Sequence, residues 1–223
     1  LQSRGLGDVY KRQDILVVGT ATTLAEAQAW QAIGADAVVA QGYEAGGHRG
    51  HFMAALEHSV VATLPLVRSC AQSLSIPVIA TGGLMDGAGI AAALTLGAQA
   101  AQMGTAFLVC DECRIAPGHR AALLSERGKT PHTSLTRLFS GRHARAIVND
   151  YMRQLQPLEG LVPGYPVFNA LTGPLRKAAA AANDDQQISL WAGQGVSLVR
   201  PMPAAKLVQL LAKELQQALQ TSN

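Results

Sequence analysis

The sequence is poor in charged and in aromatic residues, which make up 15% and 4% of its 223 positions. The formal net charge is only +3 and no block of lysines or arginines occurs, so nucleic acid is not expected as a partner. Hydrophobic residues reach 48%, a share that argues against an intrinsically disordered chain. Length and composition together predict a densely packed α/β enzyme of one domain or slightly more.

Cysteine and long apolar runs are scarce as well. The sequence has three cysteines, an odd number that fits the reducing cytoplasm better than a disulfide-stabilised secreted protein. No apolar run reaches the roughly 18 residues needed to span a bilayer, and no signal peptide precedes the body. The sequence therefore predicts a cytoplasmic protein without a membrane partner.

Residues 1–13 differ from everything that follows. They are polar, lack any hydrophobic periodicity and run directly into an apolar segment that begins at Ile15. They resemble a leader that recurs in front of unrelated open reading frames in assembled sequence data, so we expect them to be non-native or disordered. The folded body is expected to begin near Asp14 and to lack its natural start.

Short apolar runs alternate with helical segments in residues 14–127. Strands are expected at residues 15–19, 37–41, 76–80 and 98–103, with helices at residues 23–33, 64–74 and 86–96 between them. This alternation predicts a parallel sheet, either open and doubly wound or part of a (β/α)₈ barrel. Since a whole barrel needs about 250 residues and four units are visible, we predict the C-terminal half of a TIM-type barrel.

Strand signals become weak beyond Leu108. Residues 128–223 are expected to form a mainly helical segment that serves as a lid on the substrate side and ends in a C-terminal helix. Helical patterns occupy residues 118–127, 142–155, 174–182 and 204–219, and the last has a stripe of leucines typical of a helix packed on the body. Residues 160–173 and 193–203 are expected to be loops.

Glycine clusters follow three of the expected strands: Gly46-Gly47, Gly82-Gly83 and Gly104. Ligands of both candidate architectures bind at the carboxyl ends of parallel strands, where glycine lets the backbone approach closely. In barrels, the loops after the last two strands commonly hold a phosphate. Because no ligand cluster at metal spacing accompanies the glycines, the pattern indicates a phosphate-bearing cofactor. Tight turns without any ligand explain the glycines about equally well.

His48 lies in the first glycine loop, and histidine can transfer a proton near neutral pH. It is the candidate catalytic residue. Other candidates are less specific. Tyr43, Tyr165 and Trp191 are aromatic residues that could line a pocket, although aromatic residues in loops more often pack against the body. Arg142 and Arg145 are candidate contacts for an anionic group.

Residues 41–50, 76–83 and 102–105 together resemble the nitronate monooxygenase family, formerly called 2-nitropropane dioxygenases. The resemblance extends from about Asp14 to the C-terminus. It implies an FMN-dependent (β/α)₈ barrel that oxidises alkyl nitronates, of the propionate 3-nitronate type, with O₂. It implies that His48 is the catalytic histidine beside the flavin. The FMN-binding residues it implies are Gln41, Gly46, Gly47, Gly82, Gly83, Gln102, Met103, Gly104 and Thr105.

The chemistry of a nitronate suits a histidine in two ways. A protonated His48 could stabilise the negative charge of the nitronate, whereas a neutral His48 could abstract the α-proton of a nitroalkane. The sequence leaves both roles open. It also leaves open the physiological nitronate and whether the protein forms a homodimer.

The family's first four strands have no counterpart in the sequence. A half barrel would expose sheet edges and apolar surface, so we expect poor folding, aggregation or weak flavin binding. Two alternatives to nitronate oxidation stay open: an FMN- and NAD(P)H-dependent enoyl-thioester (enoyl-ACP) reductase, which has a similar Gly-Gly-His loop, and an inactive fragment that binds no flavin. An open-sheet dehydrogenase is disfavoured because no Gly-x-Gly-x-x-Gly follows the first strand.

Overall fold

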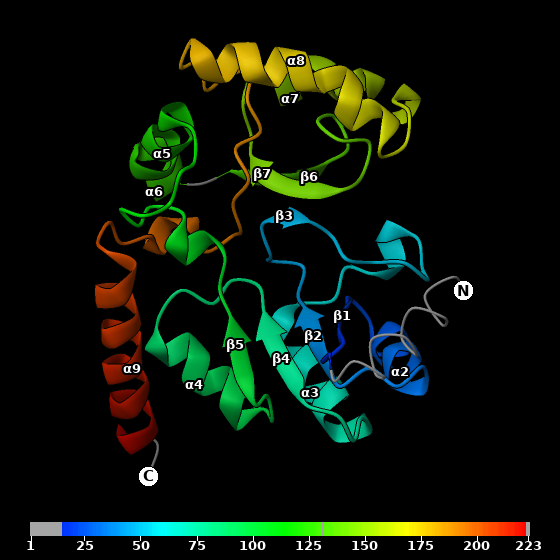
Figure 1. Cartoon of the computed structure of the whole chain (residues 1–223), viewed down its shortest axis with the longest axis vertical. Helices are drawn as coiled ribbons and strands as arrows, with labels where there is room; N and C mark the ends of the chain where they lie inside the picture. The colour runs from blue at the N-terminus through cyan, green and yellow to red at the C-terminus, as the bar shows by residue number, and fades with distance from the viewer. Residues whose placement is uncertain (1–14, 131, 222–223) are drawn as a thin grey trace. The chain divides into compact units, whose positions relative to one another are not determined.

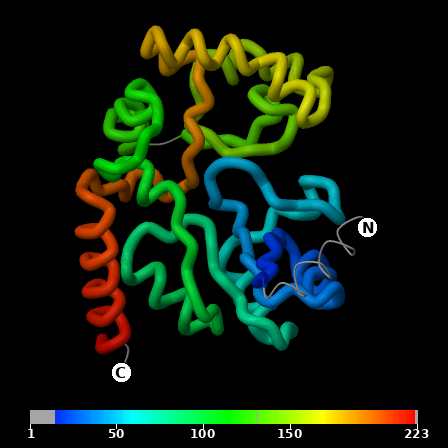
Figure 2. The backbone as a smooth tube through the Cα atoms, in the orientation of Figure 1, coloured from blue at the N-terminus to red at the C-terminus, as the bar shows by residue number. Residues whose placement is uncertain are grey.

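The computed structural model describes residues 15–130 and 132–221, so the expected leader lies outside the described residues. Backbone contacts divide the chain into two compact units. Of the described residues, the first unit comprises 15–44, 50–102 and 214–221, and the second comprises 45–49, 103–130 and 132–213. Figure 2 traces the backbone through both units. Position 127, where the sequence suggests a division, falls inside the second unit.

The first unit is built on a parallel sheet of four strands in the order β1-β2-β4-β5 (Figure 1). Its strands are β1 (Val18–Ala21), β2 (Ala37–Gln41), β4 (Val78–Thr81) and β5 (Ala100–Gln102). Helices α2 (Leu24–Ala32), α3 (Thr63–Ser73) and α4 (Gly87–Thr95) alternate with these strands along the chain and pack against them. Strand order follows chain order, as in a (β/α)₈ barrel, so the prediction of four parallel βα units is confirmed.

Local signals explain why these elements form where they do. The Thr23 hydroxyl accepts a hydrogen bond from the backbone N–H of Glu26 at 3.2 Å and caps α2. Asp86 caps α4 in the same way, by accepting from the backbone N–H of Gly89 at 2.8 Å. The central strands β2 and β4 bury apolar side chains such as Val38 and Val78. The two capping residues are the first residues of the helices expected at 23–33 and 86–96.

The Glu26 carboxylate is fully buried and connects α2 to a distant segment. One of its oxygens accepts from the backbone N–H and the hydroxyl of Thr22, both at 2.7 Å. The other accepts from the backbone N–H groups of Phe52 and Met53, at 2.6 and 3.1 Å. Burial raises the pKa of this carboxyl, but the four hydrogen bonds outweigh burial and hold its pKa below the ordinary value.

The second unit contains an antiparallel sheet in the order β3-β7-β6 (Figure 1). Its strands are β3 (Gly47–His48), β6 (Thr133–Thr136) and β7 (Ala144–Ile147). Residues 190–192 run antiparallel beside β7, since Ile147 N–H donates to the carbonyl of Leu190 at 2.9 Å and Ala192 N–H donates to that of Arg145 at 3.3 Å. The unit also contains the helices α5 (Pro117–Leu124), α6 (Glu126–Lys129), α7 (Asp150–Leu155) and α8 (Val167–Ala181). It contains 3₁₀ turns as well: η2 (Thr105–Phe107), η3 (Gln156–Leu161) and η4 (Val196–Leu198).

The tail contains mainly helices, as predicted, but one of the predicted helices is wrong. Residues 142–155, expected as one helix, contain the central strand β7 and only the short helix α7. Arg145, a candidate contact for an anionic group, is instead part of this strand, only 2% exposed, and donates to the Thr133 hydroxyl at 3.2 Å. A strand of four fully buried residues shows no alternation that could reveal it.

One other helix of the tail departs in detail from the prediction. Helix α8 begins at Val167, inside the expected loop 160–173, so that Pro174 lies within the helix instead of at its start. Helix α9 (Ala204–Thr221) is confirmed, and its leucine stripe buries Leu207 and Leu211. In the described part of the chain, no helix is long and apolar enough to cross a membrane.

Candidate functional site

The first unit brings four of the predicted FMN-binding residues to the carboxyl edge of its sheet. Gln41 pairs in register with Thr81, and Thr81 pairs with Gln102. The hydroxyl of Thr81 donates to the carbonyl of Gln102 at 2.8 Å, which fixes the two strand ends side by side. Gly82 and Gly83 continue directly from this edge, where parallel sheets bind ligands.

Gly82 and Gly83 form a turn that only glycine adopts without strain, since their φ angles are +118° and +71°. The turn is supported by Thr63, whose hydroxyl oxygen lies 2.8 Å from the carbonyl oxygen of Gly82 and 2.8 Å from Glu44 Oε2. Glu44 also accepts from the backbone N–H of Thr63 at 2.9 Å and so holds the first turn of α3. Glu44 and Thr63 are therefore supporting residues that the sequence did not single out.

In the second unit, Gly46 and Thr105 meet at the backbone of residues 192–193. A Cβ at Gly46 would lie 2.5 Å from the nitrogen of Gly193 and 2.6 Å from the carbonyl carbon of Ala192. The backbone N–H of Gly193 donates to the Thr105 hydroxyl at 2.9 Å. Close packing by itself therefore accounts for glycine at position 46.

Gly47 and Gly104 are different, because no other described residue, apart from their two chain neighbours, has an atom within 4 Å of the position that a Cβ would take. Gly47 has a φ of +70°, whereas Gly104 precedes η2 with a φ of −104°. Packing does not explain these two glycines. Open space at a glycine is what close approach of a ligand requires.

His48 is held by backbone pairing and by a buried hydroxyl. It pairs with Ala144 in the β3–β7 ladder, and the N–H of the next residue, Arg49, donates to the carbonyl of His143 at 2.9 Å. Its Nε2 lies 2.7 Å from the Oγ of Ser140, a side chain that is 1% exposed. The imidazole is thereby fixed at a second point, far along the chain.

Two aromatic rings flank the imidazole of His48. The ring centroid of Trp191 lies 5.5 Å away at 51° and that of Tyr165 lies 6.3 Å away at 65°. Trp191 is itself packed edge-on against the buried Phe139 at 5.4 Å. His48 is nevertheless exposed, so a small molecule can reach its imidazole between the two flanking aromatic rings. The proposal that Tyr165 and Trp191 line a pocket is consistent with this arrangement.

The surroundings of His48 favour its neutral form. Partial burial of the ring lowers the pKa of His48, and the positive charges of Arg142 and Arg176 lower it further. Arg142 Nε donates to the carbonyl of Arg49 at 3.2 Å, and an Arg176 Nη donates to Asn169 Oδ1 at 2.8 Å. Near pH 7 the imidazole is therefore available as a proton acceptor, in a region of positive potential.

Sequence reasoning missed Ser140 and Arg176. They lie 92 and 128 positions after His48, on segments with no recognisable motif. It also missed His119, which is 6% exposed and whose Nε2 lies 3.1 Å from the carbonyl oxygen of Trp191. No spacing rule could have brought these residues together, since their contacts join segments far apart in the sequence.

The Cys110–Cys113 segment, which has the spacing of a redox or zinc motif, forms a tight turn. Cys113 N–H donates to the carbonyl of Cys110 at 3.1 Å, and Glu112 accepts from the N–H of Ala204 at 2.9 Å. Burial and then the charge of Glu112 raise the pKa of the Cys110 thiol, which disfavours the reactive thiolate. Across residues 15–130 and 132–221, no group of three or more His, Cys, Asp or Glu side chains is arranged to hold a metal ion.

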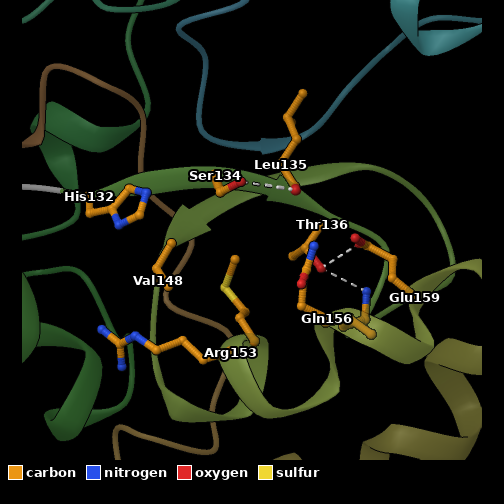
Figure 3. Close-up of a pocket in the computed structure, with 10 residues that line it drawn as sticks. His132, Ser134, Leu135, Thr136, Val148, Arg153, Gln156 and Glu159 are labelled. Carbon is orange, nitrogen blue, oxygen red and sulfur yellow. Dashed lines mark hydrogen bonds between the residues drawn. The ribbon is translucent and has the colours of Figure 1, made fainter.

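A cavity of about 350 Å³ opens elsewhere in the second unit (Figure 3). Its walls come from β6, α7, η3 and neighbouring residues, whereas the predicted site residues lie on other segments. Glu159 accepts from the Thr136 hydroxyl at 2.8 Å on one side, and Arg153 pairs with Asp150 at 2.6 Å on the other. The lining residues are His132, Ser134, Leu135, Thr136, Leu138, Val148, Met152, Arg153, Gln156 and Glu159.

Comparison with known proteins defines the class to which this fold and site belong. The chain is a member of the nitronate monooxygenase family, whose family model matches residues 5–214. A probable nitronate monooxygenase of Bacillus subtilis (strain 168) is 44% identical over 199 residues, which are 89% of this chain and 57% of the relative. One of Staphylococcus aureus (strain Newman) is 40% identical over 211 residues, or 94% of this chain and 59% of the relative. The chain thus spans somewhat more than half the length of these relatives.

Solved structures agree with this assignment. A nitroalkane oxidase from Streptomyces ansochromogenes has a TM-score of 0.93 and 44% identity, covering 99% of this chain and 63% of its own. FabK from Thermotoga maritima has a TM-score of 0.82 at 28% identity, covering 98% of this chain and 67% of its own. The family resemblance and the TIM-barrel type of fold expected from the sequence are both confirmed.

Proposed function

We propose that the complete protein carrying this sequence oxidises alkyl nitronates, of the propionate 3-nitronate type, with O₂ and with FMN as its cofactor. The observation that carries the proposal is His48, an exposed histidine that is kept neutral, anchored by Ser140 and walled by Trp191 and Tyr165. Membership of the nitronate monooxygenase family supports the same conclusion. We also propose that the protein acts in the cytoplasm.

The strand ends of the first unit fit a phosphate-bearing flavin. The left-handed turn at Gly82-Gly83 presents backbone without side chains at the edge where Gln41 and Gln102 end their strands. These four residues would hold the cofactor. Gly46, Gly47, Met103, Gly104 and Thr105 remain predictions from the resemblance, and the open space at Gly47 and Gly104 supports two of them. Bound FMN would supply the electron transfer and the reaction with O₂.

His48 and the two arginines would handle the charge of the substrate. Because the imidazole is neutral near pH 7, it can accept the α-proton of a nitroalkane. The positive potential of Arg142 and Arg176 favours the nitronate anion, whether it forms there or arrives already ionised. This proposal gives His48 the role of base toward nitroalkanes, and it gives the arginines the role of attracting nitronates.

The test is an absorption spectrum of the purified complete protein, identification of the flavin released on denaturation, and oxygen uptake with a nitronate in the absence of nicotinamide. Released FMN and nitronate-dependent oxygen uptake are expected. Turnover that requires NAD(P)H and an enoyl thioester would replace the proposal with the reductase. A folded, colourless protein without oxygen uptake would remove both activities.

A further inference from the structure

We propose that Ser140 is a positioning residue that fixes the tautomer of His48, so that Nε2 carries the proton and Nδ1 is the basic nitrogen. The inference deepens the proposed function, because it names the nitrogen through which His48 acts. It rests on three contacts made by a single hydroxyl group. None of these contacts depends on a bound cofactor.

The Oγ of Ser140 lies 2.7 Å from His48 Nε2, 3.1 Å from the carbonyl oxygen of Arg142 and 3.3 Å from the backbone nitrogen of Arg142. The hydroxyl has one proton to donate and two lone pairs to accept with. The carbonyl oxygen of Arg142 can only accept, and the backbone N–H of Arg142 can only donate. His48 Nε2 is the one partner whose role depends on the tautomer.

Only one assignment satisfies all three contacts. Ser140 donates its proton to the carbonyl of Arg142 and accepts from both the Arg142 N–H and an Nε2–H of His48. The opposite tautomer would require the hydroxyl to donate to Nε2, which would take the proton away from the Arg142 carbonyl. Because Ser140 is 1% exposed, water is poorly placed to compensate for that lost bond.

The surrounding structure limits the alternatives further. His48 belongs to the β3–β7 ladder, which fixes its backbone, and Trp191 and Tyr165 flank the ring. Ser140 lies between Phe139, which packs against Trp191, and the left-handed Gly141. A Cβ at Gly141 would lie 2.4 Å from the carbonyl oxygen of Pro163, so the turn that carries Ser140 is closely packed. Hydroxyl and imidazole are therefore both held in place.

The consequence is a directional arrangement of hydrogen bonds. With Nε2–H donating to Ser140, the lone pair of the neutral imidazole belongs to Nδ1, and a proton taken from a nitroalkane is accepted there. The Nε2–H donates to Ser140 both before and after this transfer, so the hydroxyl does not change its role during the reaction. Without the hydroxyl, neither the tautomer of His48 nor the orientation of its ring is fixed by this hydrogen bond.

The decisive measurement is ¹⁵N NMR of the complete protein labelled at histidine, because the chemical shifts distinguish a protonated ring nitrogen from one that carries a lone pair. His48→Ala identifies the signals. The expected result is a neutral His48 with the proton on Nε2. A neutral His48 with its proton on Nδ1 would overturn the proposal, and this measurement needs neither turnover nor a substituted Ser140.

Substituted variants provide a second test of the role of Ser140. Ser140→Ala is expected to give a mixture of tautomers and to lower kcat on nitroalkanes on the order of tenfold. Ser140→Thr, which keeps the hydroxyl, should restore the Nε2–H signal. Ser134→Ala removes a half-buried hydroxyl of β6 that lies 3.3 Å from the carbonyl oxygen of Leu135, and should leave the signals unchanged.

The outcomes separate this inference from the proposed function. An Nε2–H tautomer in a protein that does not oxidise nitronates would sustain the inference and reject the function. Nitronate oxidation with an Nδ1–H tautomer, or with a Ser140→Ala variant of unchanged tautomer and kcat, would sustain the function and reject the inference.

Discussion

Gly46 packs so closely against the backbone nitrogen of Gly193 that a side chain does not fit between them, since a Cβ on Gly46 would lie 2.5 Å from that nitrogen. The contact places the loop just before His48 against a segment more than one hundred residues further along the chain. Gly46, Gly47 and Gly104 of the predicted FMN site differ in packing and in backbone conformation. Substituting each of them with alanine should therefore have a different effect on stability.

Gly46→Ala should destabilise the protein by about 2 kcal/mol or more, because the new methyl group would force backbone atoms apart. Gly47→Ala should cost about 1 kcal/mol, because space is available but its φ of +70° is strained for alanine. Denaturant unfolding monitored by fluorescence measures both. Equal stability of Gly46→Ala and the unsubstituted protein would contradict the close packing.

Gly104→Ala is the matched control and also a test of cofactor binding. Its φ of −104° suits alanine and the space is open, so the free energy of unfolding should change by no more than about 0.5 kcal/mol. If FMN approaches this backbone, the flavin affinity should fall while stability in the absence of flavin stays the same. Unchanged flavin affinity, measured by fluorescence titration, would remove Gly104 from the predicted site.

Glu26→Gln should destabilise the protein by about 2–4 kcal/mol, because the amide nitrogen of glutamine would face donors that the carboxylate now accepts from. Since the folded-state pKa of Glu26 lies below the ordinary 4.5, its contribution is present above pH 4.5 and is lost as the pH falls through the folded value. Urea unfolding at several pH values measures this difference.

Glu57→Gln provides the control for that experiment, because Glu57 is an exposed acid of the 3₁₀ turn η1 (Leu56–His58) in the same unit. It should change the unfolding free energy by no more than about 0.5 kcal/mol. Equal effects of the two substitutions would show that the buried hydrogen bonds of Glu26 contribute nothing particular.

The pH dependence of nitroalkane turnover should follow the neutral form of His48. Because burial and the arginine charges lower the pKa of His48 below 6.5, the rate should rise with pH through that lowered value and be level near pH 7. Arg176→Met removes a positive charge, so the pKa of His48 and the rise in rate should both move to higher pH. Lys177→Met, at the exposed neighbouring position, is the control. An identical profile for all three proteins would contradict the electrostatic account.

The first unit could be predicted from sequence because its signals are local. Thr23 and Asp86 cap helices within a few residues, and the buried strands form continuous apolar runs. The second unit could not, because all four residues of β7 are buried, including the charged Arg145, so the strand shows neither an apolar run nor an alternation. The His48 loop was recognisable from its own glycines. Its partner Ser140, 92 positions away, is determined by tertiary pairing alone.

Oxygen uptake with a nitronate, compared between the complete protein and its His48→Ala variant at equal FMN content, tests the central claim most directly. The account predicts flavin retained in the variant and turnover of nitroalkane and nitronate lowered, by about a hundredfold or more for the nitroalkane. Unchanged turnover of both substrates, with flavin bound, would contradict it and remove His48 from the reaction.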